Sequence, residues 1–495
     1  MRACVAFDAA AWRIPEARHA ASTLATLLET PSRIAAPGER ARDGEAIVFV
    51  GAREAAPADA AAVIEVRDWP ALSARTLVAT SLGGVELPTP HGTDASHDAR
   101  IFPAEWLRAT AWLLGREEEY QDERRDQWQC YSGAYTRLAD IGLLDRPLVN
   151  LQAQSLERAI ERHAASRGAQ LEREPRWPNG ARFAVALSHD VDDVTLRSFR
   201  SSMRLLRQAR GPASYAFRAG LSGLKRALLR APGSPDPYWT FERWMTEEER
   251  HGFRSTFYFC PEPAQRHEYD PLYRLGDVLG YDGRRITVTD LIADMTRRGH
   301  EVGLHGSYQS YRDARELARQ REAIAAATPA RAAVPGIRQH FLRFDVRTTW
   351  AAQAEAGFTY DSTLGYNEAI GFRAGIAAPF VPWDAGGRIP HRLWEAPLTA
   401  MDGALFRTLG LGGEAAADRV RAHLETVEAA GGLAVLLWHP NATYTARFPG
   451  WWDCYARTLA WLEGRPAYVA PVGAVVRGWA ERAARMSGTE SAAAR

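Results

Sequence analysis

The sequence predicts an α/β protein in two parts: a (β/α)7-type barrel over residues 180–485 and a smaller N-terminal α/β domain over residues 1–175. Two observations predict this division. At 495 residues the chain exceeds the usual size of a single hydrophobic core. After the turn WPNGAR (177–182), strand and helix patterns alternate, which is typical of parallel strands joined by crossover helices.

The first predicted barrel strand, FAVALSHDVDD (183–193), is an apolar run that ends in polar residues. About seven strands are expected in all, and this number favours a barrel over an open sheet. The later strands are expected at 255–259, 301–305, 336–342, 358–364, 433–439 and 467–471, with helices at 290–298, 313–327 and 416–429, one ending at Gly357, and a last one after 471.

The N-terminal domain is expected to contain strands at AIVFV (46–50) and TLVAT (76–80). Apolar residues recur at helical spacing from Pro103 to Glu119, and a second helix is expected over 151–172; both should bridge the two domains. The charged residues from Glu117 to Glu119 and at 124–125 are predicted to form a solvated, salt-bridged face.

Composition excludes some partners. With 61 basic and 60 acidic residues the formal net charge is +1, so no nucleic-acid partner is expected. The N-terminus lacks the apolar core of a signal peptide, and no run approaches the ~20 apolar residues that cross a bilayer, so a cytoplasmic location is expected. The scattered cysteines are expected to be reduced, and residues 486–495 to form a disordered tail.

Four polar residues directly follow apolar strands: Asp190, Asp192, His305 and His439. The carboxyl ends of parallel barrel strands are where active sites form. Residues i and i+2 of a strand share a face, so both carboxylates can enter one mouth, where they need a cation or a shared proton. A neutral His305 suits a divalent ion, and His439 suits a general acid. The alternatives are capping or solvated carboxylates and structurally hydrogen-bonded histidines.

The order of SHDVD (188–192), STFYF (255–259), GHEVGLH (299–305), GIRQHFL (336–342), YDSTLGY (360–366) and LLWH (436–439) resembles the polysaccharide deacetylase superfamily, also called NodB-homology or carbohydrate esterase family 4. The resemblance covers about residues 180–485. It implies a distorted barrel and a carbohydrate deacetylase, a hydrolase of carbon–nitrogen bonds other than peptide bonds. It also implies Asp190 as general base, Asp192 as metal ligand, His439 as acid and Arg338 as the residue that holds the base. Residues 101–128 and 142–150 resemble an accessory domain fused to bacterial members.

The chain departs from this family at Gln309, which replaces the second histidine of the usual metal-binding pair and is a weak ligand. Either His340 supplies the third ligand, since it lies two residues beyond Arg338 on one strand face, or metal binding is weakened or lost. The expected ion is divalent, Zn²⁺ first, with Co²⁺, Ni²⁺ or Mn²⁺ as alternatives. Substrate contacts are expected from Tyr308, Phe341, Asp361 and Trp438, and the resemblance implies that backbone N–H groups near Phe341 are oxyanion donors.

The expected substrate is an N- or O-acetylated saccharide, or a lipid-linked precursor of a bacterial surface polysaccharide. The alternatives are hydrolysis of a cyclic or small amide on the same fold, and a non-catalytic glycan-binding protein. Glycan identity, linkage and oligomeric state stay open.

The segment 194–250 is predicted to be a basic insertion with an apolar face. It forms either a helical hairpin packed on the barrel or a surface that docks on anionic lipid or a pyrophosphate-linked glycan at the inner membrane face. Its basic and leucine residues are Arg197, Arg200, Arg204, Arg207, Arg210, Arg218, Lys225, Arg226, Arg230, Leu205, Leu206, Leu221, Leu224, Leu228 and Leu229.

Overall fold

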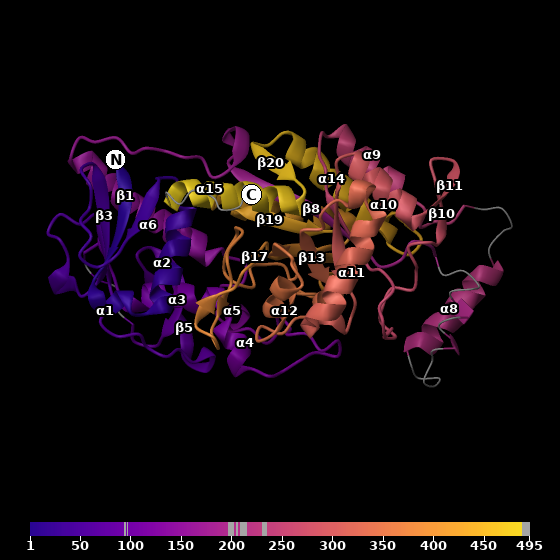
Figure 1. Ribbon diagram of the computed structural model, residues 1–495, viewed down its shortest axis with the longest axis horizontal. Coiled ribbons are helices and arrows are strands. Elements are labelled where there is room, and N and C mark those ends of the chain that lie inside the picture. The colour runs from indigo at the N-terminus through magenta and orange to yellow at the C-terminus, as the bar shows by residue number, and fades with distance from the viewer. Residues whose placement is uncertain are drawn as a thin grey trace.

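The computed structural model describes residues 1–93, 96, 98–196, 202–203, 206–207, 215–229 and 235–487. Figure 1 shows an N-terminal part, built on a five-stranded sheet, beside a larger part built on a nine-stranded sheet. Within the described residues, no helix combines the length and apolar character needed to cross a bilayer.

The nine-stranded sheet is the barrel that the sequence predicts. Its strand order is β17-β14-β13-β12-β9-β8-β19-β18, with β20 also paired to β8. Each of these pairings is parallel. The strands are β8 (Phe183–Val191), β9 (Thr256–Phe259), β12 (Glu301–Gly306), β13 (Gly336–Gln339), β14 (Tyr360–Asp361), β17 (Trp394–Glu395), β18 (Leu398–Met401), β19 (Leu433–Leu437) and β20 (Ala467–Ala470).

The sheet curls because its two end strands are neighbours in sequence. β17 ends at Glu395 and β18 begins at Leu398, yet they occupy opposite ends of the strand order. Three peptide units span at most about 11 Å, so the two edges lie close together. This closure confirms the expected distorted barrel. Neither end strand was predicted, since both are short and Pro397 lies between them.

β8 lies inside the sheet, where it pairs with three strands, and all nine of its residues are buried. Strands of a parallel sheet are covered on both faces, which explains the continuous apolar run. One edge of β8 pairs with β19, while the other pairs with β20 over Phe183–Ala186 and with β9 from Ser188.

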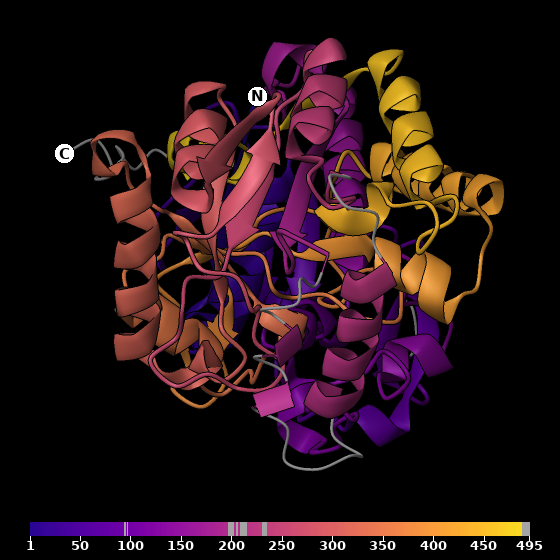
Figure 2. The ribbon, with the colours of Figure 1, turned by 90° about the vertical axis from the view of Figure 1, so that its right-hand side faces the viewer.

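Helices lie outside the barrel strands, as Figure 2 shows when this part faces the viewer. The helices expected over 290–298, 313–327 and 416–429 are present, with ends shifted by up to three residues. Met486 and Ser487, which were expected to begin a disordered tail, belong to α15. The rest of the expected tail, residues 488–495, lies outside the described residues. The helices are α9 (Phe241–Arg250), α10 (Val288–Arg297), α11 (Ala314–Ala327), α12 (Thr349–Glu355), α13 (Gly413–Ala429), α14 (Trp451–Glu463) and α15 (Val472–Ser487). Two antiparallel hairpins pair β10 (Val278–Tyr281) with β11 (Arg284–Thr287) and β15 (Trp383–Asp384) with β16 (Ile389–Pro390).

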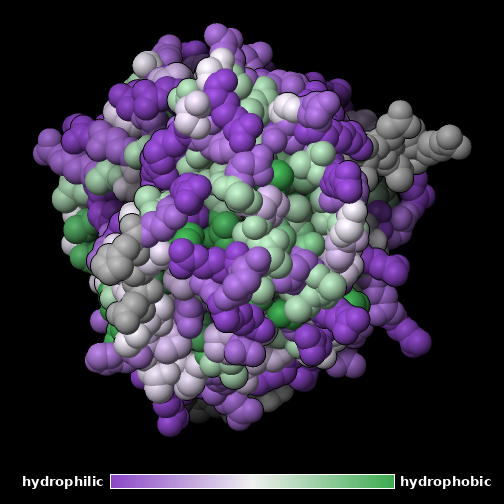
Figure 3. All heavy atoms as spheres, turned by 90° about the vertical axis from the view of Figure 1, so that its left-hand side faces the viewer, coloured by the Kyte–Doolittle hydropathy of each residue, from purple (hydrophilic) through white to green (hydrophobic). Residues whose placement is uncertain are grey.

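The N-terminal part is a parallel sheet of order β2-β1-β3-β4-β7, with α2, α3 and α6 packed on it. Phe49, Ala60 and Val63 form a second, small cluster of buried apolar residues. Figure 3 shows apolar residues in the middle of this end of the molecule, bordered by hydrophilic ones. The elements are β1 (Arg2–Phe7), α1 (Ala9–Trp12), α2 (Pro15–Leu27), β2 (Ser32–Ala35), β3 (Glu45–Gly51), β4 (Ala62–Glu65), the hairpin β5 (Leu77–Leu82) and β6 (Val85–Pro90), β7 (Ile101–Phe102), α3 (Ala104–Leu114), α4 (Glu117–Gln121), α5 (Arg137–Asp140) and α6 (Leu148–Ser166).

A buried ion network joins the N-terminal part to the barrel. Helix α3 ends at Leu114, and Arg116, with φ 49°, turns the chain into α4, so the single helix expected up to Glu119 is broken. The Glu119 carboxylate accepts hydrogen bonds from Arg116 at 2.9 Å and from Arg373 at 2.9 and 2.6 Å. Glu118 and Glu119 are each 1% exposed, so the predicted solvated face is wrong for both.

The basic insertion contains one described helix, α8 (Tyr215–Leu229). Leu221 and Leu228 on this helix are 54% and 72% exposed. Several predicted members of the basic and apolar faces lie outside the described residues: Arg197, Arg200, Arg204, Arg210, Arg230 and Leu205.

Candidate active site

Four barrel strands deliver polar side chains to one mouth. Asp190 lies near the end of β8, His305 near the end of β12, and Arg338 on β13. In the register of the sheet, His305 stands opposite Arg338. His439 follows β19 and lines the same cavity as Asp190 and His305.

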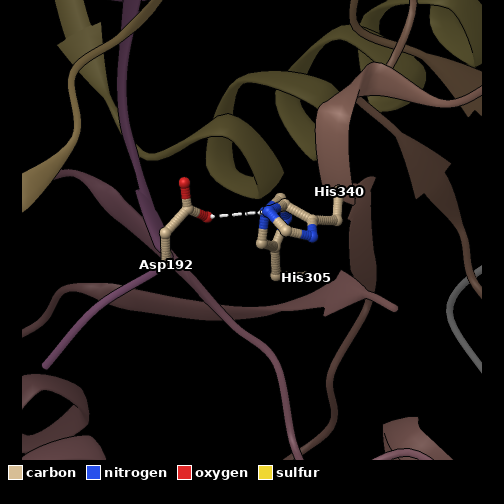
Figure 4. Close-up of side chains that lie close together, drawn as sticks. All are labelled: Asp192, His305 and His340. Carbon is tan, nitrogen blue, oxygen red and sulfur yellow. Dashed lines mark ion pairs between the residues drawn. The ribbon is translucent and has the colours of Figure 1, made fainter. Parts of the chain in front are cut away.

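Asp192, His305 and His340 point toward one another (Figure 4). Oδ1 of Asp192 lies 3.3 Å from Nε2 of His305 and 3.4 Å from Nε2 of His340. One potential ligand atom from each residue lies within 4.8 Å of the others. Asp192 Oδ1 and His305 Nε2 are buried and have no hydrogen-bond partner. Buried polar atoms are nearly always paired, so this donor set fits a divalent cation.

Local structure fixes the direction of each imidazole. Nδ1 of His305 hydrogen-bonds the carbonyl oxygen of Arg338 at 2.9 Å, so Nε2 faces the mouth. His340 opens a tight turn in which Phe341 and Leu342 have φ of 60° and 52°. Backbone in this region is costly for residues other than glycine and often occurs at functional sites.

Charges in the triad perturb one another. Burial opposes ionisation of Asp192, but the nearby imidazoles of His340 and His305 hold the pKa of this carboxyl well below its usual range. Burial alone would lower the pKa of His305, but the carboxylates of Asp190 and Asp192 raise it.

Gln309 takes no part in this cluster. Its side chain is exposed, and its Oε1 accepts a hydrogen bond from Arg343 at 3.0 Å. His340, the candidate for the third ligand, instead lies beside Asp192 and His305.

Asp190 is held by Arg338, and both side chains are buried. Nη1 of Arg338 donates to Asp190 Oδ1 at 3.0 Å and to Ser188 Oγ at 2.8 Å. The rest of the guanidinium donates to the carbonyl and hydroxyl oxygens of Ser362, each at 2.9 Å. The other Asp190 oxygen, Oδ2, lies 3.9 Å from Nε2 of His305. Asp190 therefore presents its second oxygen toward the triad.

His439 is oriented by Asp402, a residue that the sequence interpretation missed. Asp402 directly follows the apolar strand β18, the same signal that identified the other strand-end residues. It accepts from Nδ1 of His439 at 2.8 Å, and Nε2 of His439 lies 3.5 Å from Asp192 Oδ2. Burial would lower the pKa of His439, but Asp402 and then Asp192 and Asp190 raise it to about 9.

The mouth opens into a cavity of about 600 Å³. Phe341 lines it, as expected, whereas Tyr308, Asp361 and Trp438 do not. Asp361 and Trp438 are fully buried, and the Tyr308 hydroxyl donates to the backbone of Trp128 behind the cavity wall. The sequence interpretation also missed the lining residues from the N-terminal part: Asp126, Gln127, Trp128 and Ser132.

No protein-family model and no curated protein matches the chain. Among solved structures, a protein of Mycobacterium smegmatis described as a polysaccharide deacetylase aligns with TM-score 0.42 and 21% identity, over 62% of this chain and 93% of that one. The Puue allantoinase aligns with TM-score 0.41 and 15% identity, over 64% and 95%. A probable polysaccharide deacetylase of Pseudomonas aeruginosa PAO1 aligns with TM-score 0.39 and 16% identity, over 63% and 95%. At this level of similarity, the distorted α/β barrel rests on the chain's own strand order and closure.

Proposed function

We propose that the chain is a metal-dependent hydrolase that removes acetyl groups from an N- or O-acetylated sugar, such as a precursor of a bacterial surface glycan. One observation carries the proposal: the triad of Asp192, His305 and His340 lies between the Asp190–Arg338 pair and the His439–Asp402 pair. Hydrolysis of an amide or ester needs one group that accepts a proton from water and a second, separate group that donates a proton to the leaving group.

Two histidines and one carboxylate are ligands that suit Zn²⁺, with Co²⁺, Ni²⁺ or Mn²⁺ as alternatives. When bound, such an ion polarises the carbonyl group of an amide or ester and acidifies adjacent water. The hydrogen bond from Arg338 orients Asp190, so the Asp190 carboxylate can take the proton from the attacking water. His439, whose pKa is raised to about 9, is protonated near neutral pH and can donate to the departing amine or alcohol.

Release of acetate tests the proposal. The protein, loaded with Zn²⁺ or Co²⁺, is offered N-acetylated and O-acetylated oligosaccharides, with allantoin as a small cyclic amide. Acetate release that disappears in Asp190→Asn supports the deacetylase. Ring opening of allantoin without acetate release supports the small-amide alternative, and metal-independent binding without turnover supports a glycan-binding protein.

We also propose that the basic insertion places the cleft at an anionic surface. Residues 197–230 contain nine Lys or Arg residues and no acidic residue. The two flanks of this basic stretch lie side by side, because Asp236 accepts from the backbone N–H of Leu196 at 2.8 Å and of Tyr238 at 3.0 Å. The Tyr238 hydroxyl accepts from Arg447, which lines the cavity, at 2.6 Å.

Lipid is the occupant that this composition favours. Arg218, Leu221, Lys225 and Leu228 recur at helical spacing on α8, and each is exposed. Exposed leucines among cations are typical of helices that lie on anionic membranes. A lipid-linked glycan would then reach the cleft from the surface on which α8 lies.

A further inference from the structure

Three aromatic rings form one wall of the cavity beside the metal-binding triad. Trp128 stacks on Phe341 with ring centroids 5.0 Å apart and 30° between the planes, and it meets Tyr269 edge-on at 5.2 Å. All three residues line the cavity, and Trp128 is half-buried. The Phe341 ring also lies 4.6 Å from the ring of His340, so the aromatic wall begins next to a triad residue.

Trp128 reaches this wall from outside the barrel, on the segment between α4 and α5. A turn closed by Asp126 shapes the segment: its Oδ1 accepts from the backbone N–H groups of Trp128 and Cys130, each at 2.8 Å. Two contacts fix the segment to the barrel: the Tyr308 hydroxyl donates to the Trp128 carbonyl at 2.9 Å, and the Cys130 thiol donates to the Phe341 carbonyl at 3.2 Å. The indole is therefore held in position before any ligand binds, which lowers the entropic cost of binding.

Polar side chains border the aromatic wall. Asp126, Gln127, Glu268 and Asp270, which adjoin Trp128 and Tyr269 in sequence, also line the cavity. Pyranose rings present apolar C–H groups to the electron-rich face of an aromatic ring and hydroxyl groups to carboxylates and amides at its border. The volume of about 600 Å³ lies within the ~300–1,000 Å³ of sites that hold ligands larger than one sugar ring.

We propose that Trp128, with Tyr269 and Phe341, forms a subsite for the sugar ring adjacent to the acetylated unit. The N-terminal part thereby completes the substrate site, and the chain acts on oligosaccharides in preference to monosaccharides. This inference rests on the proposed function for the identity of the neighbouring reaction site. The binding of the adjacent sugar ring depends on Trp128 and does not depend on the reaction at the neighbouring site.

Binding and turnover of matched sugars test the subsite separately from the chemistry. The probes are N-acetylglucosamine, its β-1,4-linked trimer, and the corresponding galactosamine and mannosamine compounds. The proteins are the metal-loaded parent, Trp128→Ala, Trp128→Phe and Trp69→Ala. Trp69 is a matched control, because it is also half-buried but lines a different cavity, beside Arg108. Titration of each protein in the Asp190→Asn background gives dissociation constants without turnover.

We expect Trp128→Ala to raise KM and the dissociation constant for the favoured trimer roughly tenfold, with little change for the monomer. In Trp128→Ala the metal content, kcat and thermal midpoint should stay near parent values. Trp128→Phe should keep most of the affinity for the trimer, and Trp69→Ala should keep all of it. Trimer binding that depends on Trp128 supports the subsite even if no acetate is released, a result that contradicts the proposed function alone. Equal losses for monomer and trimer, unchanged trimer affinity in Trp128→Ala, or no trimer bound by the parent would overturn the subsite.

Discussion

Asp402 holds His439 at two points: one carboxylate oxygen lies 2.8 Å from Nδ1 of the imidazole, and the other accepts the backbone N–H of His439, also at 2.8 Å. The ring is therefore fixed with Nε2 toward Asp192 and the cavity. The same carboxylate favours the protonated imidazole, so it sets both the direction and the charge of the proposed acid.

The first prediction follows from this pair. His439 must be protonated to act as an acid, and its pKa is raised to about 9 against burial by Asp402, with Asp192 and Asp190 contributing. Asp402→Asn should move the alkaline limb of kcat/KM to lower pH and reduce the plateau rate. The pH profile and metal content of both proteins check this. An unchanged alkaline limb in a variant that still binds metal would remove Asp402 from its proposed role.

The second prediction concerns Asp190. Asp190→Asn keeps the shape of the side chain but cannot accept the proton from water, so turnover should fall by about 10²–10⁴-fold. The variant should still bind metal, since Asp190 is not a member of the metal-binding triad. Single-turnover rates and elemental analysis of the same sample separate the two effects. Loss of metal with turnover would make Asp190 a ligand instead.

The third prediction concerns stability. Burial would raise the pKa of Glu119, but Arg373 and Arg116 lower it from 4.5 to about 2. Its contribution is therefore present above pH 4.5 and is lost as the pH falls toward 2. Glu119→Gln leaves two buried arginines without their shared carboxylate and should cost about 3–5 kcal/mol near neutral pH.

Denaturant unfolding of parent and variant at several pH values measures this effect. The difference between them should shrink as the pH falls below 4.5. Glu123→Gln is the matched control, because the Glu123 side chain is 88% exposed. A Glu119→Gln variant no less stable than the control would contradict the assigned network.

The fourth prediction is that α8 binds anionic vesicles. Each basic residue near an anionic surface contributes about 1 kcal/mol. Exchanging Arg218 and Lys225 for glutamate should therefore weaken sedimentation with phosphatidylglycerol vesicles roughly tenfold or more, whereas Arg315→Glu on α11 should not. Binding should also weaken as salt rises. Equal binding to neutral vesicles, or none to either kind, would refute the membrane contact.

Most of the barrel could be predicted from sequence because its strands are buried on both faces. The nine residues of β8 form one apolar run, and a polar residue at a strand end is visible without a structure. Asp402 carried the same signal but was missed, because β18 is short and follows Pro397.

Features that depend on distant partners could not be predicted. Glu119 belongs to a charged run that is typical of a solvated helix, and its burial depends on Arg373, 254 residues away. Trp128 likewise joins the cavity through Phe341, with which it shares no local pattern. His340 was expected at the site because residues i and i+2 of a strand share a face, but β13 ends at Gln339 and His340 opens the turn that follows.

Metal content is the most direct test of the central claim that Asp192, His305 and His340 hold one divalent ion. Elemental analysis after loading with Zn²⁺ should give about one ion per chain for the parent and for Gln309→Ala. His340→Ala and His305→Ala should lose the ion and the release of acetate together. Parent-like metal content in His340→Ala, or loss of metal in Gln309→Ala, would contradict the account.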